Sequence, residues 1–307
     1  MEEKPMINTV NTTPTSPSNY KQGIIDYYSE AGMDYEPWSR RFNMHFGYFR
    51  LGVNPFNREA MLDEMNNQAL SRLQLSLNKA NTLLDLGCGV GASGRFIVSN
   101  TELVTVISAT IVPWQVKKAK ELSTDRAFQE RLTFELMDYC KLPLADQSID
   151  GAYALESSCY DKGKDKRRFL EESFRILKPG ARLVVADGFT KGEKHTRLFN
   201  FLYRKVCKGW MLDDFAGIDV FVKAMRDIGY EDIQVQDASW RVALSVMYVP
   251  WVSLKYFFSK IFFNKNDIKI EMGHFVAPVF GMLMGLHRSQ YGYHIISARK
   301  PIEQDRQ

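Results

Sequence analysis

The chain has 307 residues, of which 45% are hydrophobic, 25% charged and 13% aromatic. This composition is typical of a globular protein with a sizeable core, and it excludes disordered and fibrous classes. The 40 Lys and Arg residues face 36 Asp and Glu residues, so the formal net charge is only +4. Without a long basic run, the sequence lacks the charge pattern of a nucleic-acid-binding protein.

The cysteines and the first residues both favour the cytoplasm. We expect reduced thiols rather than disulfides, because no Cys-x-x-Cys spacing occurs among Cys88, Cys140, Cys159 and Cys207. The histidines also lack metal-ligand spacing, so no metal is predicted. Residues 1–22 contain no apolar run that would suggest a signal peptide. They are rich in Ser, Thr, Pro and Asn, and we expect a disordered lead-in.

Predicted elements then alternate along the chain. An N-terminal helical arm is expected over 23–80, with helices at Gly23–Gly32 and Glu59–Leu77. The segment 81–237 alternates strands and helices. Its strands are predicted at Thr82–Leu86, Leu103–Ala109, Leu132–Leu136, Ile149–Leu155, Ala181–Ala186 and Asp232–Asp237. Its helices are predicted at Ser93–Ser99, Gln115–Leu122, Asp165–Leu177 and Phe215–Ile228.

A last strand is predicted at Gly292–Arg299, within the final segment 291–307. The whole pattern predicts an α/β fold, with a doubly wound, mostly parallel sheet of seven strands. Ligands of such a sheet bind beyond the carboxyl ends of the strands.

A long apolar insertion, 238–290, separates the last strand from the one before it. Its length is far above the median connection of roughly 4–6 residues, so we expect a lid and acceptor-pocket wall. The stretch Val242–Phe263 resembles a membrane span but contains Lys255 and Lys260. Since a charge near a helix centre costs about 2.5–3.5 kcal/mol on insertion scales, a surface-lying helix or lid is favoured. Such a helix is compatible with peripheral membrane contact.

The most informative segment is Leu83–Phe96, LLDLGCGVGASGRF. A strand that runs into three alternate glycines and then a helix lets the backbone approach a ligand closely. The pattern also satisfies a loose dinucleotide fingerprint. However, Asp85 precedes the first glycine, and Val104–Val112 contains no ribose-binding acid, so a nicotinamide cofactor is disfavoured. A tight turn that binds nothing is the alternative.

Three segments, in order, carry a family resemblance: LLDLGCGVG, MDYCKLPLADQSIDGAYALESSCY and FLEESFRILKPGARLVVADGF. Together they resemble the class I S-adenosylmethionine-dependent methyltransferases over roughly Tyr27 to Arg299. The segments IIDYYSEAGMDY, HFGYF and ALESSCYDK resemble the sterol, tocopherol and prenyl-diphosphate branch of that class. The resemblance implies a Rossmann-like methyltransferase fold and S-adenosyl-L-methionine as the cofactor.

The resemblance also implies which residues bind this cofactor. The amino-acid and ribose parts are expected to contact Asp85, Gly87, Cys88, Gly89 and Gly91, and the adenine to contact Asp138 and Tyr139. The alternative for Asp138 is a solvated turn. The family often has an acid at the end of the second strand, where this chain has ISATIVPWQ. We therefore expect Thr110 or Gln115 to take its place.

Three residues are candidates for catalysis. Glu156 directly follows the fourth strand in an apolar run, where a carboxylate is costly to bury unless it is paired or used. Tyr160 is four residues further on, and His45 lies between apolar neighbours. Their structural alternatives are an ion pair for Glu156, ordinary packing for Tyr160 and a hydrogen-bonded structural role for His45.

The aromatic arm and the insertion are expected to enclose an apolar acceptor, because a polar one would match such walls poorly. We therefore expect methyl transfer to a lipophilic small molecule, sterol-, isoprenoid- or quinone-like. Carbon attack is favoured over oxygen attack because no histidine stands in the motif after the fourth strand. The alternatives are O-methylation of a phenol or quinol, cyclopropane formation on a lipid, and a non-enzymatic lipid carrier. The carrier is disfavoured because Asp85, the glycines and Asp138 are all present.

Overall fold

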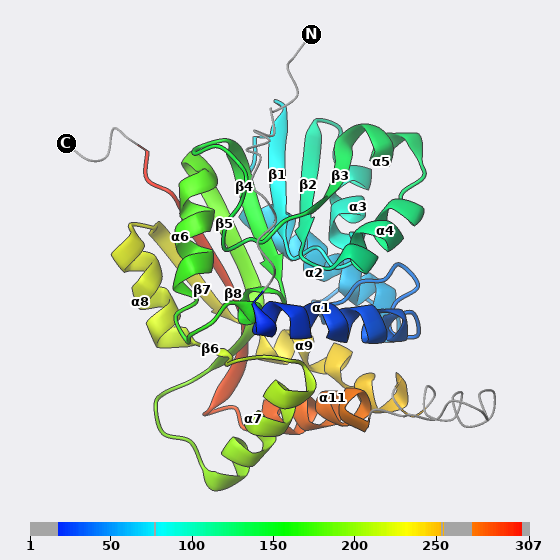
Figure 1. Ribbon diagram of the computed structural model, residues 1–307, viewed down its shortest axis with the longest axis vertical. Helices are drawn as coiled ribbons and strands as arrows, with labels where there is room; N and C mark the ends of the chain where they lie inside the picture. Colours follow the sequence, from blue (N-terminus) through cyan, green and yellow to red (C-terminus); the bar gives the residue numbers. More distant parts are fainter. Residues whose placement is uncertain (1–17, 77, 253, 255–271, 303–307) are drawn as a thin grey trace.

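The computed structural model describes residues 18–76, 78–252, 254 and 272–302. Within these residues, one eight-stranded sheet runs through the molecule with helices on both faces (Figure 1). Seven strands lie in the order β3-β2-β1-β4-β5-β8-β7, and β6 pairs with the end of β5. The bounds are β1 Asn81–Leu86, β2 Val104–Thr110, β3 Leu132–Leu136, β4 Ile149–Leu155, β5 Leu177–Thr190, β6 Ala216–Gly217, β7 Glu231–Asp237 and β8 Tyr291–Arg299.

The strand directions confirm the predicted doubly wound, mostly parallel α/β sheet. Strands β1 to β5 pair in parallel, whereas β8 is antiparallel to both of its neighbours, β5 and β7. β5 is longer than predicted: it begins at Leu177 rather than Ala181 and ends at Thr190 rather than Ala186. Its extra length lets it pair with β8 over nine residue pairs and with β6 at its carboxyl end.

Two hydrophobic layers hold the helices against the sheet. On one face pack α6 (Arg167–Ile176) and α8 (Ile218–Ile228). On the other face pack α2 (Arg58–Arg72), α3 (Ala92–Ser99), α4 (Pro113–Glu121) and α9 (Ser239–Val246). β8 supplies Ile296 to the first layer and Ile295 to the second, because successive side chains of a strand point to opposite faces. The short α5 (Arg126–Arg131) precedes β3.

Helix ends follow local signals. α8 ends at the predicted Gly229, which adopts φ +108° and caps the helix in the left-handed conformation. α1 (Asn19–Ala31) begins earlier than the predicted Gly23, because the Ser18 hydroxyl accepts a hydrogen bond from the backbone N–H of Lys21. The end of the segment predicted as a disordered lead-in is therefore helical. Residues 1–17 of that segment lie outside the described residues.

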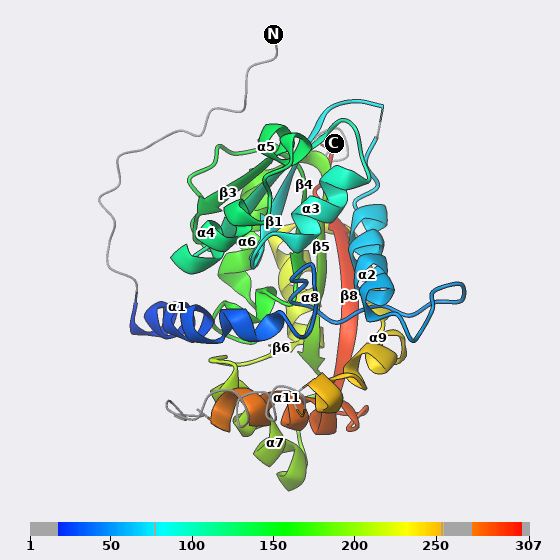
Figure 2. The ribbon, with the colours of Figure 1, turned by 90° about the vertical axis from the view of Figure 1, so that its right-hand side faces the viewer.

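The arm crosses the edge of the sheet at which the strands end. α1 runs roughly perpendicular to the strands (Figure 2), and the 3-10 turn η1 (Gly32–Tyr35) follows it. Lys21 pairs with Asp138 beyond β3, and Tyr28 bonds to Tyr160 in the 3-10 turn η2 (Ser158–Tyr160) beyond β4. The arm therefore covers the position where ligands of such a sheet bind.

The insertion 238–290 is helical where the structure describes it. It contains α9, a helical turn at 249–252 and α11 (Met272–Gly285), which packs against α7 (Arg197–Gly209). In the described parts of the chain, every helix is too short or too polar to cross a bilayer. Part of Val242–Phe263 lies outside the described residues, and the role of the insertion as a lid stays a prediction.

Lys166 holds the loop that carries η2. Its side chain is fully buried, and Nζ donates to the backbone carbonyls of Cys159, Asp161 and Asp214 at 3.0, 2.7 and 2.7 Å. Burial lowers the pKa of this ammonium. One side chain thus satisfies three carbonyl groups and joins the loop after β4 to the segment before β6.

Replacing Lys166 by Met should destabilise the fold strongly, because three buried carbonyls lose their donor at once. Each unsatisfied buried group costs about 1–3 kcal/mol, so we expect a loss of roughly 3 kcal/mol or more in the free energy of unfolding. Urea unfolding followed by circular dichroism measures it. Lys164→Met, at an exposed position in the same loop, is the control, and equal midpoints for the two variants would contradict the assignment.

Candidate active site

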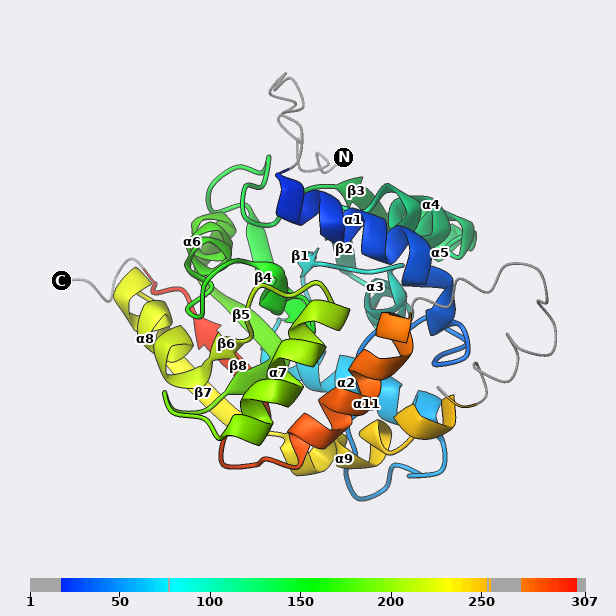
Figure 3. The same cartoon turned by 60° about the horizontal axis from the view of Figure 1, so that its bottom comes forward.

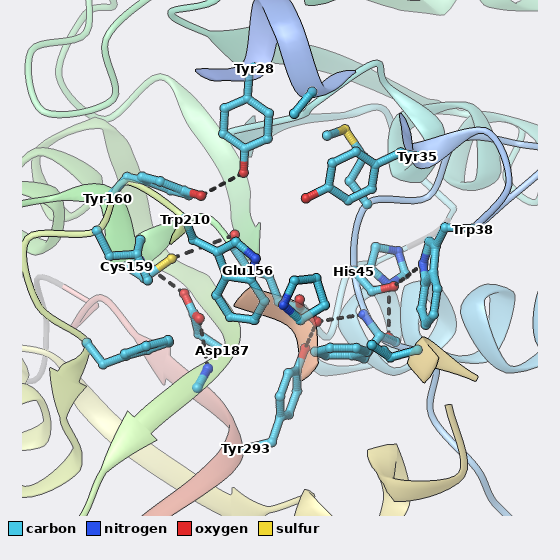
Figure 4. Close-up of a pocket in the computed structure, with 18 of the residues that line it drawn as sticks. Tyr28, Tyr35, Trp38, His45, Glu156, Cys159, Tyr160, Asp187, Trp210 and Tyr293 are labelled. Carbon is cyan, nitrogen blue, oxygen red and sulfur yellow. Dashed lines mark hydrogen bonds between the residues drawn. The ribbon is translucent and has the colours of Figure 1, made fainter. Parts of the chain in front are cut away.

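A cavity lies beneath α1 at the carboxyl ends of β4 and β5 (Figure 4). We call it the arm cavity. Its arm-side wall consists of Tyr27, Tyr28, Ala31, Tyr35, Trp38, Met44, His45 and Phe46. The sheet and the segment after α7 add Glu156, Cys159, Tyr160, Asp187, Gly188, Trp210, Leu212, Phe215, Tyr291 and Tyr293. The insertion adds Val249, Val252 and Pro278, so the arm and the insertion face one space.

The glycine loop after β1 has the conformation that its sequence requires. Gly87, Gly89 and Gly91 adopt φ of +95°, +53° and +78°, which side chains with a Cβ rarely adopt. A Cβ on Gly89 would approach the Met44 sulfur to 2.7 Å. Gly91 is also the N-cap of α3, so the loop leads directly into a helix N-terminus. Cys88 is buried, and its thiol donates to the Gly89 carbonyl.

Asp85 lies beside this loop with one carboxyl oxygen unsatisfied. It is 3% exposed, and no described residue bonds to its Oδ2. Burial raises the pKa of this carboxyl to about 7, and the neighbouring Tyr153 hydroxyl opposes this shift by a smaller amount. A buried carboxyl with one unsatisfied oxygen, next to three left-handed glycines, fits a ligand that brings a cationic or hydrogen-bonding group. The amino-acid end of S-adenosylmethionine has such groups.

The residues predicted to contact ribose and adenine already have protein partners. Thr110 donates to Gln115 Oε1 at 2.6 Å, and both side chains are buried where β2 ends. Asp138 pairs with Lys21 of the arm, and its Oδ1 accepts from the Cys140 N–H at 3.0 Å. The Tyr139 hydroxyl donates to the Ser157 carbonyl at 2.8 Å. Their contacts with a bound cofactor stay predictions.

Glu156 is held in an unusual backbone conformation beyond β4. Its φ is +53°, and its N–H donates to the Ala186 carbonyl of β5 at 2.8 Å. The side-chain Oε1 accepts from the Phe46 N–H at 2.6 Å and from the Tyr293 hydroxyl at 2.9 Å. Among the described residues, no lysine or arginine forms an ion pair with it. The structural alternative of an ion pair is therefore not seen in this part of the chain.

Burial, with a smaller contribution from Asp187, raises the pKa of Glu156 to about 8. Asp187 was not singled out by the sequence analysis, although it ends an apolar run much as Glu156 does. It is buried and accepts from the Ser158 hydroxyl, the Cys159 N–H and the Gly188 N–H at 2.7, 3.1 and 2.8 Å. The two carboxyls share one wall of the arm cavity (Figure 4).

Tyr160 closes the cavity against the arm. Its hydroxyl lies 2.8 Å from that of Tyr28, and the two rings meet edge to face with centroids 5.8 Å apart. Burial raises the pKa of both phenols well above the usual value, so both are neutral. The pair offers a polar group in an otherwise aromatic region.

His45 lines the cavity but directs both ring nitrogens at the protein. Nδ1 lies 3.0 Å from the Phe46 carbonyl and Nε2 lies 3.1 Å from the Asn66 Oδ1. Burial lowers the pKa of this imidazole. The geometry favours the alternative of a hydrogen-bonded structural histidine. Its contact with the Phe46 carbonyl helps to fix the backbone of Phe46, whose N–H donates to Glu156. Within the described residues, no cluster of potential metal ligands occurs.

Comparison with known proteins adds to this geometry. The methyltransferase domain family matches residues 84–185. The chain is 24% identical over 306 residues to a probable chloroplastic tocopherol O-methyltransferase of Oryza sativa subsp. japonica, covering 93% of this chain and 80% of that protein. It is 32% identical over 229 residues to the 2-methyl-6-phytyl-1,4-hydroquinone methyltransferase of Synechocystis sp., covering 72% of this chain and 66% of that protein.

Among solved structures, the cyclopropane synthase MmaA2 from Mycobacterium tuberculosis superposes with a TM-score of 0.75 at 14% identity, covering 94% of this chain and all of that chain (100%). This likeness concerns the fold, whereas the matching methyltransferase domain, the relatives and the glycine loop beside Asp85 point to one cofactor and one reaction type. The chain belongs to the class I S-adenosylmethionine-dependent methyltransferases.

Proposed function

We propose that the protein methylates a lipophilic acceptor of the isoprenoid or quinol class in the arm cavity, and that Glu156 acts on this acceptor. One observation carries the proposal. Glu156 is a buried carboxyl set in an aromatic wall, and both of its described donors bind the same oxygen, Oε1. Among the described residues, Oε2 accepts no hydrogen bond, so it is available to the acceptor.

The glycine loop, Asp85 and Asp138 are the residues proposed to hold the cofactor. When bound, S-adenosylmethionine supplies an electrophilic methyl group. The remaining work falls to the protein, which has to align the acceptor and exclude water. α1 performs the second task, because its contacts to Asp138 and Tyr160 close the edge of the sheet above the cavity.

The cavity walls indicate the shape of the acceptor. Aromatic and aliphatic side chains dominate, so the acceptor must be largely apolar. Glu156 follows β4 and Asp187 belongs to β5, so these two polar groups lie on the sheet side of the cavity, whereas Val249 and Val252 come from the insertion. This polarity suits a ring with a hydroxyl group at the sheet side and a hydrocarbon chain directed at the insertion. The names of the tocopherol and phytyl-hydroquinone relatives support the same class.

The residue available as a base, the Glu156 carboxyl, favours methyl transfer to carbon over transfer to oxygen. A carbon that gains a methyl group must then lose a proton. In the cavity wall, Glu156 Oε2 is the base proposed to take this proton. Aromatic rings around the site stabilise positive charge on the acceptor before the proton leaves. Oxygen acceptors are commonly activated by histidine, but both nitrogens of His45 are already engaged. Mass spectrometry of the product distinguishes carbon methylation, O-methylation and cyclopropane formation.

Replacing Gly89 by Val should weaken cofactor binding strongly while the fold survives. The φ of +53° strains any β-branched residue, and the new side chain would meet Met44 where the backbone has to approach the ligand. Calorimetry with S-adenosylhomocysteine should show at least about a tenfold loss of affinity. Gly52→Val is the matched control, because Gly52 has φ +93° but no atom within 4 Å of the added Cβ. Equal affinities in both variants would reject the assignment.

Glu156→Gln preserves shape but removes charge and basicity. Turnover should fall by about 10²-fold or more, the usual scale for loss of a general base. Cofactor affinity should change little, because the lost interaction forms mainly in the transition state. Single-turnover kinetics and calorimetry measure the two effects separately, with the exposed Glu102→Gln as control. If Glu156→Gln keeps the turnover of the wild type, or loses only cofactor affinity, Glu156 has a structural role and does not act on the acceptor.

The pH dependence of turnover should report the ionisation of Glu156. Because its pKa is raised to about 8, the rate should increase with pH through this value as the carboxylate forms. The Tyr293 hydrogen bond favours the ionised form, so Tyr293→Phe should raise the pKa further and move the rise to higher pH. Tyr291→Phe, in the same wall, should leave the midpoint in place. A midpoint that does not respond to Tyr293→Phe would exclude Glu156 as the titrating base.

A further inference from the structure

One end of the molecule exposes apolar side chains on adjacent helices. α7 and α11 lie side by side there (Figure 3), and the segment after α11 reaches α9 through Arg288, which lies over the Trp240 ring. α7 buries Phe199, Leu202 and Val206 against the core. An adjoining side of the helix exposes Leu198 and Phe201, at 58% and 51%. The solvent-facing surface of the helix therefore includes two large apolar side chains.

The exposed apolar side chains continue from α7 across α11. The Phe201 ring meets Phe280 of α11 edge to face, with centroids 5.9 Å apart. Further along the chain, Leu286 is 72% exposed, and Arg288 lies over the ring of Trp240, which is 76% exposed. We call these exposed side chains the end patch, which comprises Leu198, Phe201, Leu283, Leu286 and Trp240.

Basic residues border the end patch on α7. Four exposed cations lie along this helix, which contains no acidic residue: Arg197, Arg204, Lys205 and Lys208. The Lys205 ammonium lies 5.6 Å from the centre of the Phe201 ring. The acidic residues on its flanks are Glu193, Asp213 and Asp214, and Asp214 accepts a hydrogen bond from the Tyr203 hydroxyl of the helix. Apolar side chains next to a basic stripe are the pattern of helices that lie in a membrane interface.

We propose that the end patch docks on the surface of an anionic lipid bilayer. Single exposed apolar residues need no explanation, but a contiguous group on adjacent helices marks an interaction surface. The charge on α7 complements anionic headgroups. The same positive charge disfavours the main alternative, in which the end patch binds a second copy of this chain, because two positively charged patches would repel each other.

The end patch lies on the outer side of elements that also line the arm cavity. Trp210 follows α7 and Pro278 lies within α11, and both face the cavity. The Trp210 ring packs close to Gly281 of α11. Docking would therefore bring one cavity wall next to the bilayer, where an apolar acceptor dissolves. The docking proposal itself does not depend on the identity of the acceptor.

Sedimentation of the full chain with vesicles tests the proposal. Vesicles of phosphatidylcholine alone are compared with vesicles that also contain phosphatidylserine, at low and high salt. We expect binding to the anionic vesicles that weakens as salt rises. Each basic residue near an anionic surface contributes about fivefold in partitioning, so Arg204→Gln/Lys205→Gln/Lys208→Gln should lower binding by roughly 10²-fold.

The matched control removes the same charge from exposed positions elsewhere, as Lys79→Gln/Lys117→Gln/Lys120→Gln. This control variant should bind like the wild type, whereas Leu198→Ser/Phe201→Ser should lose binding to the anionic vesicles at both salt concentrations. Equal losses in the two charge variants, or no vesicle binding by the wild type, would overturn the proposal. Light scattering tests the alternative of a dimer. If the wild type is a dimer that does not bind vesicles, and Leu198→Ser/Phe201→Ser is a monomer, the end patch is an interface between two copies of the chain. Methyl transfer is measured in a separate assay in detergent, so that a failure of the proposed function is distinguished from a failure of membrane docking.

Discussion

A carboxyl buried at the end of β4 needs hydrogen-bond donors, and the fold supplies them from two distant segments. Phe46 of the arm and Tyr293 of β8 both bind Oε1 of Glu156. Without them, burial would protonate the group even more strongly. The arm, the antiparallel β8 and the end of β4 therefore meet at one atom. The shape of the arm cavity and the chemistry proposed for it both follow from this requirement.

The parts of the site that depend on local signals could be predicted from the sequence. The alternation of strand and helix patterns predicted the sheet, and the alternate glycines predicted the loop beside Asp85. Contacts between distant segments could not be predicted in this way. The pairing of Lys21 with Asp138 spans 117 positions, and no local pattern links the two residues. Asp187 was missed even though its apolar context resembles that of Glu156.

Buried polar groups shape the loop after β4 more than its apolar residues do. Lys166 satisfies three carbonyls, and Asp187 accepts three hydrogen bonds, two of them from η2. Since unsatisfied buried groups are expensive, few alternative conformations of this loop are accessible. The same interactions place Tyr160 under Tyr28 of the arm. A rigid loop below a covering helix is a suitable arrangement for a reaction that depends on alignment.

The position of β8 has a consequence for how the protein matures on the ribosome. β8 is the last strand in chain order, yet it lies between β5 and β7. β7 therefore has no place in the sheet until β8 has emerged, while β1 to β5 can already pair with one another. Synthesis proceeds from the N-terminus, and early segments fold first. The half that contains the glycine loop can thus assemble ahead of the half that supplies the Tyr293 hydroxyl, and the acceptor wall is completed last.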